Sequence, residues 1–353
     1  MTPRKRIRII VILIMTGIIS AVFVSIETHP VGYDVAAEGD FVYVSNNDGV
    51  VVVDKSVYNA PVRVANIPVG DGAFGLDIEN DRLYAAGSSS GLVIVDISVP
   101  TSPVILGDVA LGAATNVFVT GNCAYVVDTD GELVIVDVSN SSDPSILGIL
   151  DVGSRGNDVA VAGNTAYFAD PDSGLVVIDV SEPSSPGIIQ TLSNTYGAWD
   201  ICIYEDILYL GCHGNGLRVF NISSPEEPTW LSSFDNGGEV YGVSGNREYL
   251  VLADLQEGAE LLDVTDLRNP VLVAEYSNAA PHSVYYDGNY AYLGDQDKEF
   301  ILIDFDADEP IGYPSRSLKI NLLWAIPIIL LSIGISVIVL PIVGARMKKS
   351  QWF

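Results

Sequence analysis

The sequence predicts an all-β fold, a seven-bladed β-propeller with four strands in each blade. The segment Gly91–Asp96, which reads GLVIVD, is one of seven similar segments, and their closing Asp or Asn recurs every 41 or 42 residues. A fixed period of this length is typical of repeat architectures. Each unit also holds four short β-rich runs, separated by turns rich in Gly, Pro, Asn and Asp, with no helical stretch between them. Four strands per repeat are the pattern of a propeller blade.

We call the four strands of each repeat A, B, C and D. The repeats fall near residues 32–71, 72–112, 113–153, 154–194, 195–236, 237–278 and 279–310. Strand B carries a tyrosine in six repeats, at Tyr43, Tyr84, Tyr125, Tyr167, Tyr209 and Tyr292. Strand C closes with Asp54, Asp96, Asp137, Asp179, Asn221, Asp263 and Asp304. Such residues accept backbone N–H groups in the turn that follows, so this column is expected to be structural.

These units resemble LVIVD repeats, a family of exported or surface β-propellers of bacteria and archaea. The resemblance covers about residues 32 to 310. It implies the fold and a position outside the cytoplasm. The family as a whole implies no single activity, so the ligand has to be argued from this chain's own residues.

The charge of the chain is concentrated in the repeats. All 45 acidic residues lie between Glu27 and Glu309, whereas residues 27–317 hold nine Lys or Arg, which gives this part a charge of 9 − 45 = −36. Such a body repels nucleic acid and anionic lipid headgroups. It suits cations, basic partners or simple solubility.

The three cysteines do not form a disulfide framework. Cys202 and Cys212 fall in one hairpin, whose turn we place at Glu205-Asp206. That register pairs Cys202 with Tyr209, so free thiols are expected.

Both ends of the chain carry membrane signals. Residues 1–21 read as a signal sequence or signal anchor, because basic residues precede an apolar run. After a linker at 311–319, the uncharged run Ile320–Ala345 is long enough for a transmembrane helix. The basic residues of the tail 346–353 are expected to keep it in the cytoplasm. The repeats then lie outside the cytoplasm, in a chain that spans the cell membrane once, or twice if the first segment is not cleaved.

Closure of the ring is a separate question. The sequence pattern predicts that repeat seven stops after strand C, because Pro310–Pro314 is too rich in Pro and Gly for a good strand. We therefore expect Val22–Ile26 to supply strand D of the last blade, which assigns 22–310 to the propeller and favours a cleaved signal.

The alternation of strand directions gives the ring two faces. The first face carries the D–A connections and B–C turns, and the second carries the A–B and C–D turns. Because repeat seven ends at strand C, the second face is expected to look toward the bilayer. The first face collects aromatic side chains beside an acidic column at the start of strand A. The candidate binding residues there are Tyr33, Asp34, Asp77, Asn116, Asp158, Trp199, Asp200, Tyr241 and His282, with Phe74 and Tyr196 beside them.

The B–C turns contain pairs of acidic residues two positions apart. The clearest are Asp128 with Asp130 and Asp170 with Asp172. Such pairs are compatible with Ca²⁺, which prefers several oxygen ligands. The alternative is that Asp and Asn simply form turns before Gly. No complete Ca²⁺-loop motif occurs, which favours the second interpretation, and no other cofactor is indicated.

The sequence favours a binding function for a protein or glycan partner over enzymatic activity. There is no G-x-S-x-G, H-E-x-x-H or C-x-x-C motif, and the three histidines belong to different segments. No catalytic residue is therefore assigned. The alternatives are an exported hydrolase that uses carboxylates at the channel, and a structural component of the cell surface.

Overall fold

The computed structural model describes residues 8–15, 18–25, 31–57, 60–235, 237–296, 298–304 and 311–312. The chain divides into two units, Met1–Tyr313 and Pro314–Phe353. All described residues belong to the first unit. The run Ile320–Ala345 lies outside the described residues, and so do 1–7 and most of the expected linker.

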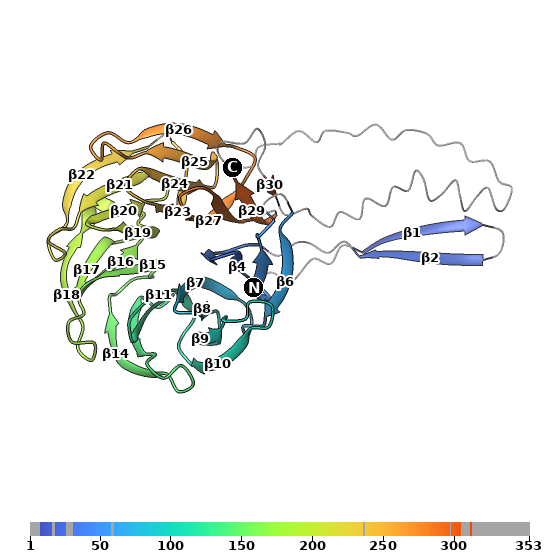
Figure 1. Ribbon diagram of the computed structural model, residues 1–353, viewed down its shortest axis with the longest axis horizontal. Coiled ribbons are helices and arrows are strands. Elements are labelled where there is room, and N and C mark those ends of the chain that lie inside the picture. The colour runs from blue at the N-terminus through green and yellow to red at the C-terminus, as the bar shows by residue number, and fades with distance from the viewer. Residues whose placement is uncertain are drawn as a thin grey trace. The chain divides into compact units, whose positions relative to one another are not determined.

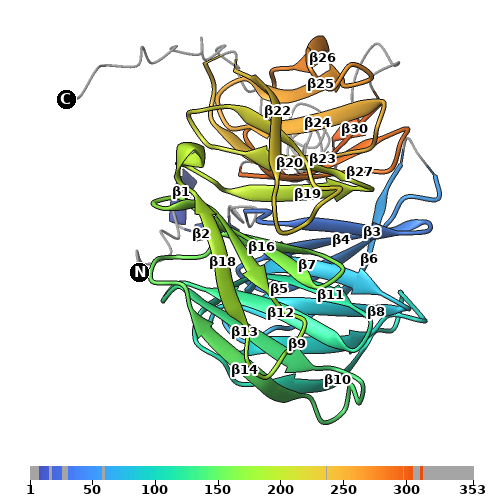
Figure 2. The same cartoon turned by 90° about the vertical axis from the view of Figure 1, so that its left-hand side faces the viewer.

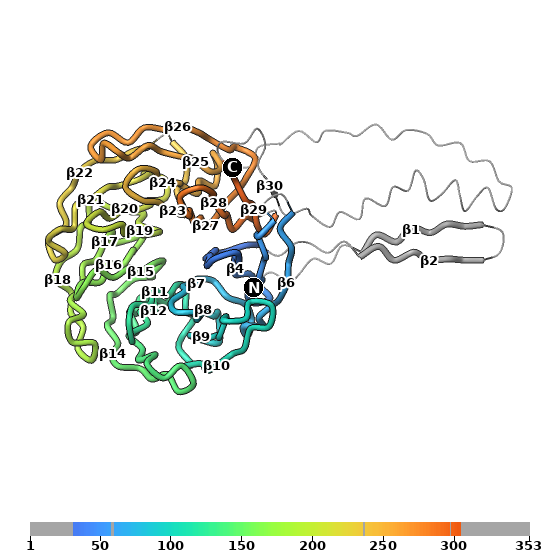
Figure 3. Tube along the Cα trace, viewed as in Figure 1, coloured from blue at the N-terminus to red at the C-terminus, as the bar shows by residue number. Residues whose placement is uncertain are grey.

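The fold prediction is confirmed: seven four-stranded antiparallel sheets stand around a ring, and each sheet is a meander of consecutive strands (Figure 1). In the Cα trace the colour passes once around the ring, so that the first blade lies beside the last (Figure 3). Figure 2 shows the same blades from the side.

The strands of blades one to four are short and similar in length. Blade one comprises β3 (Val35–Glu38), β4 (Phe41–Asn46), β5 (Gly49–Asp54) and β6 (Val62–Ile67). Blade two comprises β7 (Ala73–Glu79), β8 (Arg82–Gly87), β9 (Gly91–Asp96) and β10 (Val104–Val109). Blade three comprises β11 (Ala114–Thr120), β12 (Cys123–Asp128), β13 (Glu132–Asp137) and β14 (Ser145–Asp151). Blade four comprises β15 (Asp158–Ala162), β16 (Thr165–Asp170), β17 (Gly174–Asp179) and β18 (Gly187–Leu192).

The remaining blades repeat this pattern. A 3₁₀ turn, η1 (Ser193–Thr195), precedes blade five, which comprises β19 (Asp200–Tyr204), β20 (Ile207–Gly211), β21 (Leu217–Asn221) and β22 (Thr229–Phe234). Blade six comprises β23 (Val240–Gly245), β24 (Tyr249–Asp254), β25 (Gly258–Asp263) and β26 (Val271–Tyr276). Blade seven comprises β27 (Pro281–Tyr286), β28 (Ala291–Asp295), β29 (Glu299–Ile303) and β30 (Ile311–Gly312).

The repeated apolar strand is strand C of each blade. In β9, every residue from Gly91 to Val95 is buried, and only the closing Asp96 is partly exposed. The strand is covered on both sides because neighbouring blades pack face to face, so nearly all its side chains are apolar rather than alternating. The tyrosines of strand B are also buried. The hydroxyls of Tyr167 and Tyr209 donate to backbone oxygens of the following blade at 2.7 and 3.1 Å.

The closing residue of strand C is structural, as predicted. In blades one to six its Oδ1 accepts the backbone N–H two positions later, at 2.8 to 3.1 Å. Hydrogen bonds from the side chains of Ser56 and Ser98, together with these backbone hydrogen bonds, favour the ionised form and hold the pKa of Asp54 and Asp96 below the ordinary range.

Strand D of the last blade differs from the expectation. The structure supplies it from β30, where Leu302 pairs with Ile311 and Ile301 with Gly312. The residues Val22–Ser25 belong instead to β2 (Ile18–Ser25), which pairs with β1 (Arg8–Met15) as a separate two-stranded sheet. Pro310 and Pro314 flank Ile311–Gly312 rather than interrupting it, so they shorten this strand without preventing it.

The direction of β30 determines the face at which the chain leaves blade seven. Because β30 is antiparallel to β29, it runs from the second face back toward the first. The chain therefore does not leave blade seven at the second face, and the argument that this face looks toward the bilayer no longer holds.

Polar contacts join blades seven and one. On the first face, Asn46 Nδ2 donates to Glu299 Oε1 at 2.9 Å. Glu299 has φ 65°, at a position where five other blades have Gly with positive φ, such as Gly258. On the second face, Lys55 lies 3.6 Å from Asp287 and 4.8 Å from the centroid of the Tyr292 ring.

Two smaller expectations can be compared with the structure. Cys202 pairs with Tyr209, and all three cysteines are free, as predicted. Within the part of the chain that is described, no helix has the length and apolar character that a membrane crossing requires.

Candidate functional site

The start of strand A places two columns of side chains on the first face. Adjacent residues of a strand point to opposite sides. The first column holds five ring-bearing residues in five consecutive blades, at Phe74, Tyr33, His282, Tyr241 and Trp199. Blades three and four have Thr115 and Asn157 at the equivalent positions.

The five rings form a continuous arc across blades two, one, seven, six and five. Tyr33 meets Phe74 edge to face, with ring centroids 4.9 Å apart, and lies 6.5 Å from His282. Tyr241 lies 5.4 Å from His282 and 4.7 Å from Trp199. We call these five residues the aromatic arc. Each is only partly buried, so none is lost to the blade cores.

Polar groups surround the Trp199 end of the arc. His213, in the B–C turn of blade five, shares a 3.1 Å hydrogen bond with the Tyr241 hydroxyl. Its Nε2 lies 3.8 Å from the Glu239 carboxylate. The guanidinium of Arg155 lies over the Trp199 ring, 5.8 Å from its centroid. No sequence pattern singles out His213, Glu239 or Arg155 as site residues.

The other end of the arc is fixed by two amide side chains. The Tyr33 hydroxyl donates to Asn47 Oδ1 at 3.0 Å. His282 Nε2 shares a 2.7 Å hydrogen bond with Gln296. Burial lowers the pKa of His282 below its ordinary value, and the nearby Asp295 carboxylate opposes this effect. Burial therefore favours the uncharged form of His282. Tyr196 lies apart, 57% exposed and outside these ring contacts.

The acidic column lies between blades rather than at the mouth of the channel. Asp34 Oδ2 accepts the backbone N–H of Leu76 in the next blade at 2.8 Å. Asp158 accepts from Ile201 at 2.7 Å in the same way. We call such hydrogen bonds between blades staples. The Val243 N–H donates to Asp200 at 2.6 Å and the Val119 N–H to Asp77 at 2.6 Å, while Asn116 Nδ2 donates to Asp158 Oδ1 at 2.7 Å. These side chains hold neighbouring innermost strands together.

Asp77 stands in a different register from the rest of this column. It pairs with Tyr84, whereas Asn116, Asp158 and Asp200 pair two residues beyond the strand B tyrosine. The true equivalent of Asp34 in blade two is Gly75, and a Cβ there would lie 2.1 Å from Asn116 Oδ1. Asp77 nevertheless performs the same function, because residues two apart in a strand share a side.

Burial dominates the electrostatics of the column. It raises the pKa of Asp34 to about 7, with nearby Asp200 and Asp77 adding to the effect. It also raises the pKa of Asp77 to about 6 and of Asp200 to about 6, against the backbone N–H donors that lower both. Burial and the adjacent Asp200 raise the pKa of Asp158 well above its ordinary value. Burial thus makes these carboxyls bind protons at a higher pH than carboxyls in water do.

The acidic residues that begin the B–C turns are held by backbone N–H groups of the same turns. Asp128 and Asp170 are buried, and the Oδ1 of each accepts two backbone N–H groups of the turn. Asp130 and Asp172 are exposed. Within the described residues, no group of three or more His, Cys, Asp or Glu side chains is placed to hold a metal ion.

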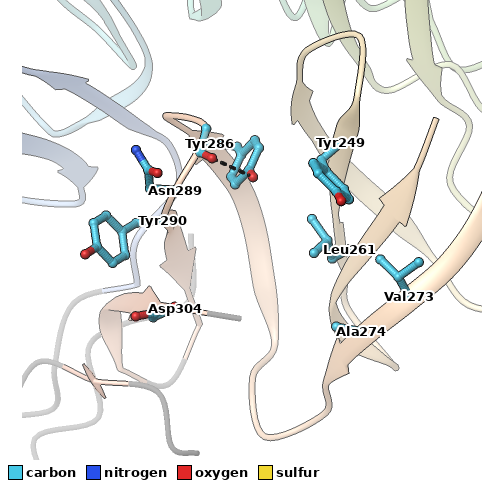
Figure 4. A pocket seen from close by; sticks show the side chains of 9 residues that line it. Tyr249, Leu261, Val273, Ala274, Tyr286, Asn289, Tyr290 and Asp304 are labelled. Carbon is cyan, nitrogen blue, oxygen red and sulfur yellow. Dashed lines mark hydrogen bonds between the residues drawn. The ribbon is translucent and has the colours of Figure 1, made fainter. Parts of the chain in front are cut away.

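A cavity of about 490 Å³ lies between blades six and seven. Figure 4 shows Tyr249, Leu261 and Val273 on one side of it and Tyr286 and Tyr290 on the other. At the equivalent place in other blades, the C–D turn of the next blade contacts strand D. Ser232, for example, donates to Leu267 O at 2.5 Å. The corresponding connection of blade seven falls in 305–310, outside the described residues, so this cavity is not counted as a ligand site.

A family model for the LVIVD repeat matches six segments of the chain, together more than half of its 353 residues. The matched segments are 32–64, 73–110, 111–152, 154–193, 197–236 and 282–305. No match covers blade six. The search of curated proteins returned no match for the chain.

Solved structures of low sequence identity share the fold. The β-propeller domain of Cps50 (Swd1) from Myceliophteria thermophila aligns with a TM-score of 0.65 at 12% identity, covering 78% of this chain and 98% of that one. The designed protein Ika8 aligns at 0.58 and 12%, covering 79% and 98%. Sqt1 from Saccharomyces cerevisiae aligns at 0.56 and 8%, covering 80% and 84%. At these identities the likeness concerns the fold alone.

Proposed function

This chain belongs to the LVIVD repeat family, and we propose that it is a membrane-anchored, extracytoplasmic interaction module that binds a partner through its first face. The single observation that supports this proposal best is the aromatic arc. The staple positions of strand A hold acids or Asn in blades three and four as well, at Asn116 and Asp158. The positions that carry rings in the other five blades hold no ring in blades three and four, where the residues are Thr115 and Asn157. Two of the seven blades therefore form without a ring at this position, so the fold itself does not require the rings.

The arc has the physical properties of a binding surface. Its rings are partly exposed, and each is positioned by a strand of a rigid scaffold. Aromatic side chains supply a large contact area at small cost in conformational entropy. The arc crosses five blades, so a partner that covers it contacts segments far apart in the sequence. A protein surface or a glycan has the necessary extent.

The location is proposed from the two ends of the chain. Arg4, Lys5, Arg6 and Arg8 precede an apolar run, and Ile320–Ala345 is uncharged and followed by Arg346, Lys348 and Lys349. This pattern supports export of the repeats, a C-terminal membrane helix and a cytoplasmic tail. Protease added to intact cells should digest the repeats and spare an epitope fused after Phe353. Protection of the repeats with loss of the epitope would reverse the topology.

The hydrolase alternative is weaker on chemical grounds. Both carboxylate oxygens of Asp34 accept backbone N–H groups, from Val35 and Leu76, and those of Asp77 accept from Ile78 and Val119. A general acid or nucleophile needs a carboxyl group that can reach a substrate. These carboxylates hold blades together, so their loss should lower stability before it affects any reaction.

The binding proposal is tested with the full-length protein purified in mild detergent and immobilised. Extracellular material from the same cells is passed over wild type, Trp199→Ala and Trp230→Ala. Trp230 is the matched control, since it is a 47% exposed Trp of the same blade that lies against Arg218, but on the outermost strand. Retention by wild type and Trp230→Ala but not by Trp199→Ala supports the proposal. Equal retention by all three would refute it, and self-association without any ligand would favour a structural component.

A further inference from the structure

The Trp199 end of the arc offers a positive group a corner formed by two aromatic rings, which we call the cage. The Trp199 and Tyr241 rings are in edge-to-face contact, inclined at 66° with centroids 4.7 Å apart, so a ligand can contact both rings from their exposed side. The Glu239 carboxylate lies 3.8 Å from His213 Nε2, and the His213 ring contacts Tyr241 with ring centroids 5.1 Å apart, so the carboxylate is close to the same rings. Aromatic faces carry negative potential and attract ammonium and guanidinium groups, and a nearby carboxylate adds to the attraction.

The protein already places one cation on this cage. Arg155 belongs to the exposed connection between blades three and four, and its guanidinium lies 5.8 Å from the Trp199 centroid. Attraction between the guanidinium and the negative face of the Trp199 ring favours this position of the exposed Arg155 side chain. Arg155 thus acts as an internal stand-in for a positively charged ligand.

The surrounding charge favours the same ligand class. Exposed acids on the connections of the first face include Asp48, Asp71, Asp130, Asp172 and Asp235. Within the described residues of these connections the cations are Arg155 and Lys298. Lys298 is also occupied, since its Nζ donates to Asn278 O and lies 6.0 Å from the centroid of the Tyr276 ring. Exposed acids outnumber the cations on these described connections, so the face carries net negative charge and would concentrate a positively charged partner.

From these three observations we propose that the aromatic arc binds a basic segment of a partner protein, with an Arg or Lys side chain against the exposed side of Trp199 and Tyr241. This inference rests on the proposed binding function and names its ligand class. An uncharged glycan would stack on the rings and donate hydroxyl hydrogen bonds to acceptors such as Glu239, but it would gain nothing from the net charge of the face.

The experiment measures binding to the full-length protein in detergent by calorimetry. The probes are a peptide of four Arg-Gly-Ser repeats, its Glu-Gly-Ser counterpart and a neutral chitin oligosaccharide. We expect the basic peptide alone to bind, with affinity falling at least tenfold, roughly, between low and high salt because the interacting charges are exposed. Trp199→Ala should weaken it about tenfold or more, and Glu239→Gln by a few fold at least, roughly. Trp230→Ala is the control and should leave the affinity unchanged.

Arg155→Ala gives the sharpest result, because its sign depends on the ligand. Removal of the internal cation should strengthen binding of the basic peptide about two- to fivefold. If Arg155→Ala weakens binding, or if the acidic peptide or the oligosaccharide binds and the basic peptide does not, the cationic ligand class is wrong while the binding function stands. If no probe binds and Trp199→Ala also retains cellular partners as wild type does, the proposed function itself fails.

Discussion

Trp199 and Asp200 are neighbours in sequence but have separable functions, and this gives the most informative prediction. Asp200 Oδ2 accepts the Val243 N–H of the next blade at 2.6 Å, whereas Trp199 contacts rings of the arc. Loss of a hydrogen bond to a charged group that leaves a buried partner unpaired costs about 1.5–3 kcal/mol. Relief of the repulsion between Asp158 and Asp200 offsets part of this. We therefore expect Asp200→Ala to destabilise the propeller by about 2 kcal/mol.

In a melting experiment this loss corresponds to a fall in Tm of roughly 4 °C for a domain of this size. Trp199→Ala removes a partly exposed aromatic pair, which is worth about 1 kcal/mol, so its Tm should fall by about half as much. Binding should show the opposite order. Trp199→Ala should lose about 2 kcal/mol of partner affinity, as truncated aromatic anchors do, and Asp200→Ala much less.

Both variants are measured by calorimetric melting and by partner affinity on the same preparations. If Asp200→Ala leaves Tm within about 1 °C of wild type, the interpretation of the acidic column as inter-blade staples is refuted. If the two variants lose affinity equally while both remain folded, the acids are ligands after all. Asp77→Ala serves as a second staple control, since it lies in blade two, away from Trp199.

Two further predictions concern the ring. For its closure, a double-mutant cycle of Asn46→Ala and Glu299→Gly should show a coupling energy of about 1.5 kcal/mol or more in chemical denaturation, because the buried amide donates to a carboxylate at 2.9 Å. Strict additivity of the two changes would contradict closure through this contact. For pH, Asp34, Asp77 and Asp200 have folded pKa values of about 7, about 6 and about 6, above their unfolded values. Their contribution to stability is complete below the unfolded pKa and is lost as pH rises through the folded pKa, so Tm should fall from pH 5 to 7.5 at constant ionic strength. Asp34→Asn should reduce that slope, and an unchanged slope would count against a raised pKa.

Much of the fold was predictable because one period governs it. The spacing of the closing Asp residues gives seven units, and the turn at Glu205-Asp206 gives the correct pairing of Cys202 with Tyr209. Strand D of blade seven was not predictable in the same way. A two-residue strand between prolines has no periodicity to detect, and only the backbone pairing of Ile311 with Leu302 reveals it.

The candidate site was predictable in position but not in chemistry. The alternation of strands correctly indicates that the residues before the acidic column share the first face. It does not tell whether an Asp at this place points to solvent or to the next blade. His213 is an isolated histidine in the sequence, although its place in a B–C turn before Gly-Asn-Gly puts it on that same face. The contact with Tyr241 and Glu239 depends on a left-handed backbone at His213, with φ 41°, which a sequence pattern does not show.

Blade six shows why the site and the repeat pattern have to be considered separately. It has Val251 in place of the strand B tyrosine and Gly242 at the staple position, and the family model does not match it. The staple survives through a different residue, since Ser244 Oγ accepts the Tyr286 N–H at 2.9 Å two positions further along the strand. The same blade contributes Tyr241 and Glu239, two of the groups that form the cage. A pattern built from the positions that the fold requires is therefore least informative where this chain places its binding chemistry, and the arc becomes visible only when ring contacts between blades are followed.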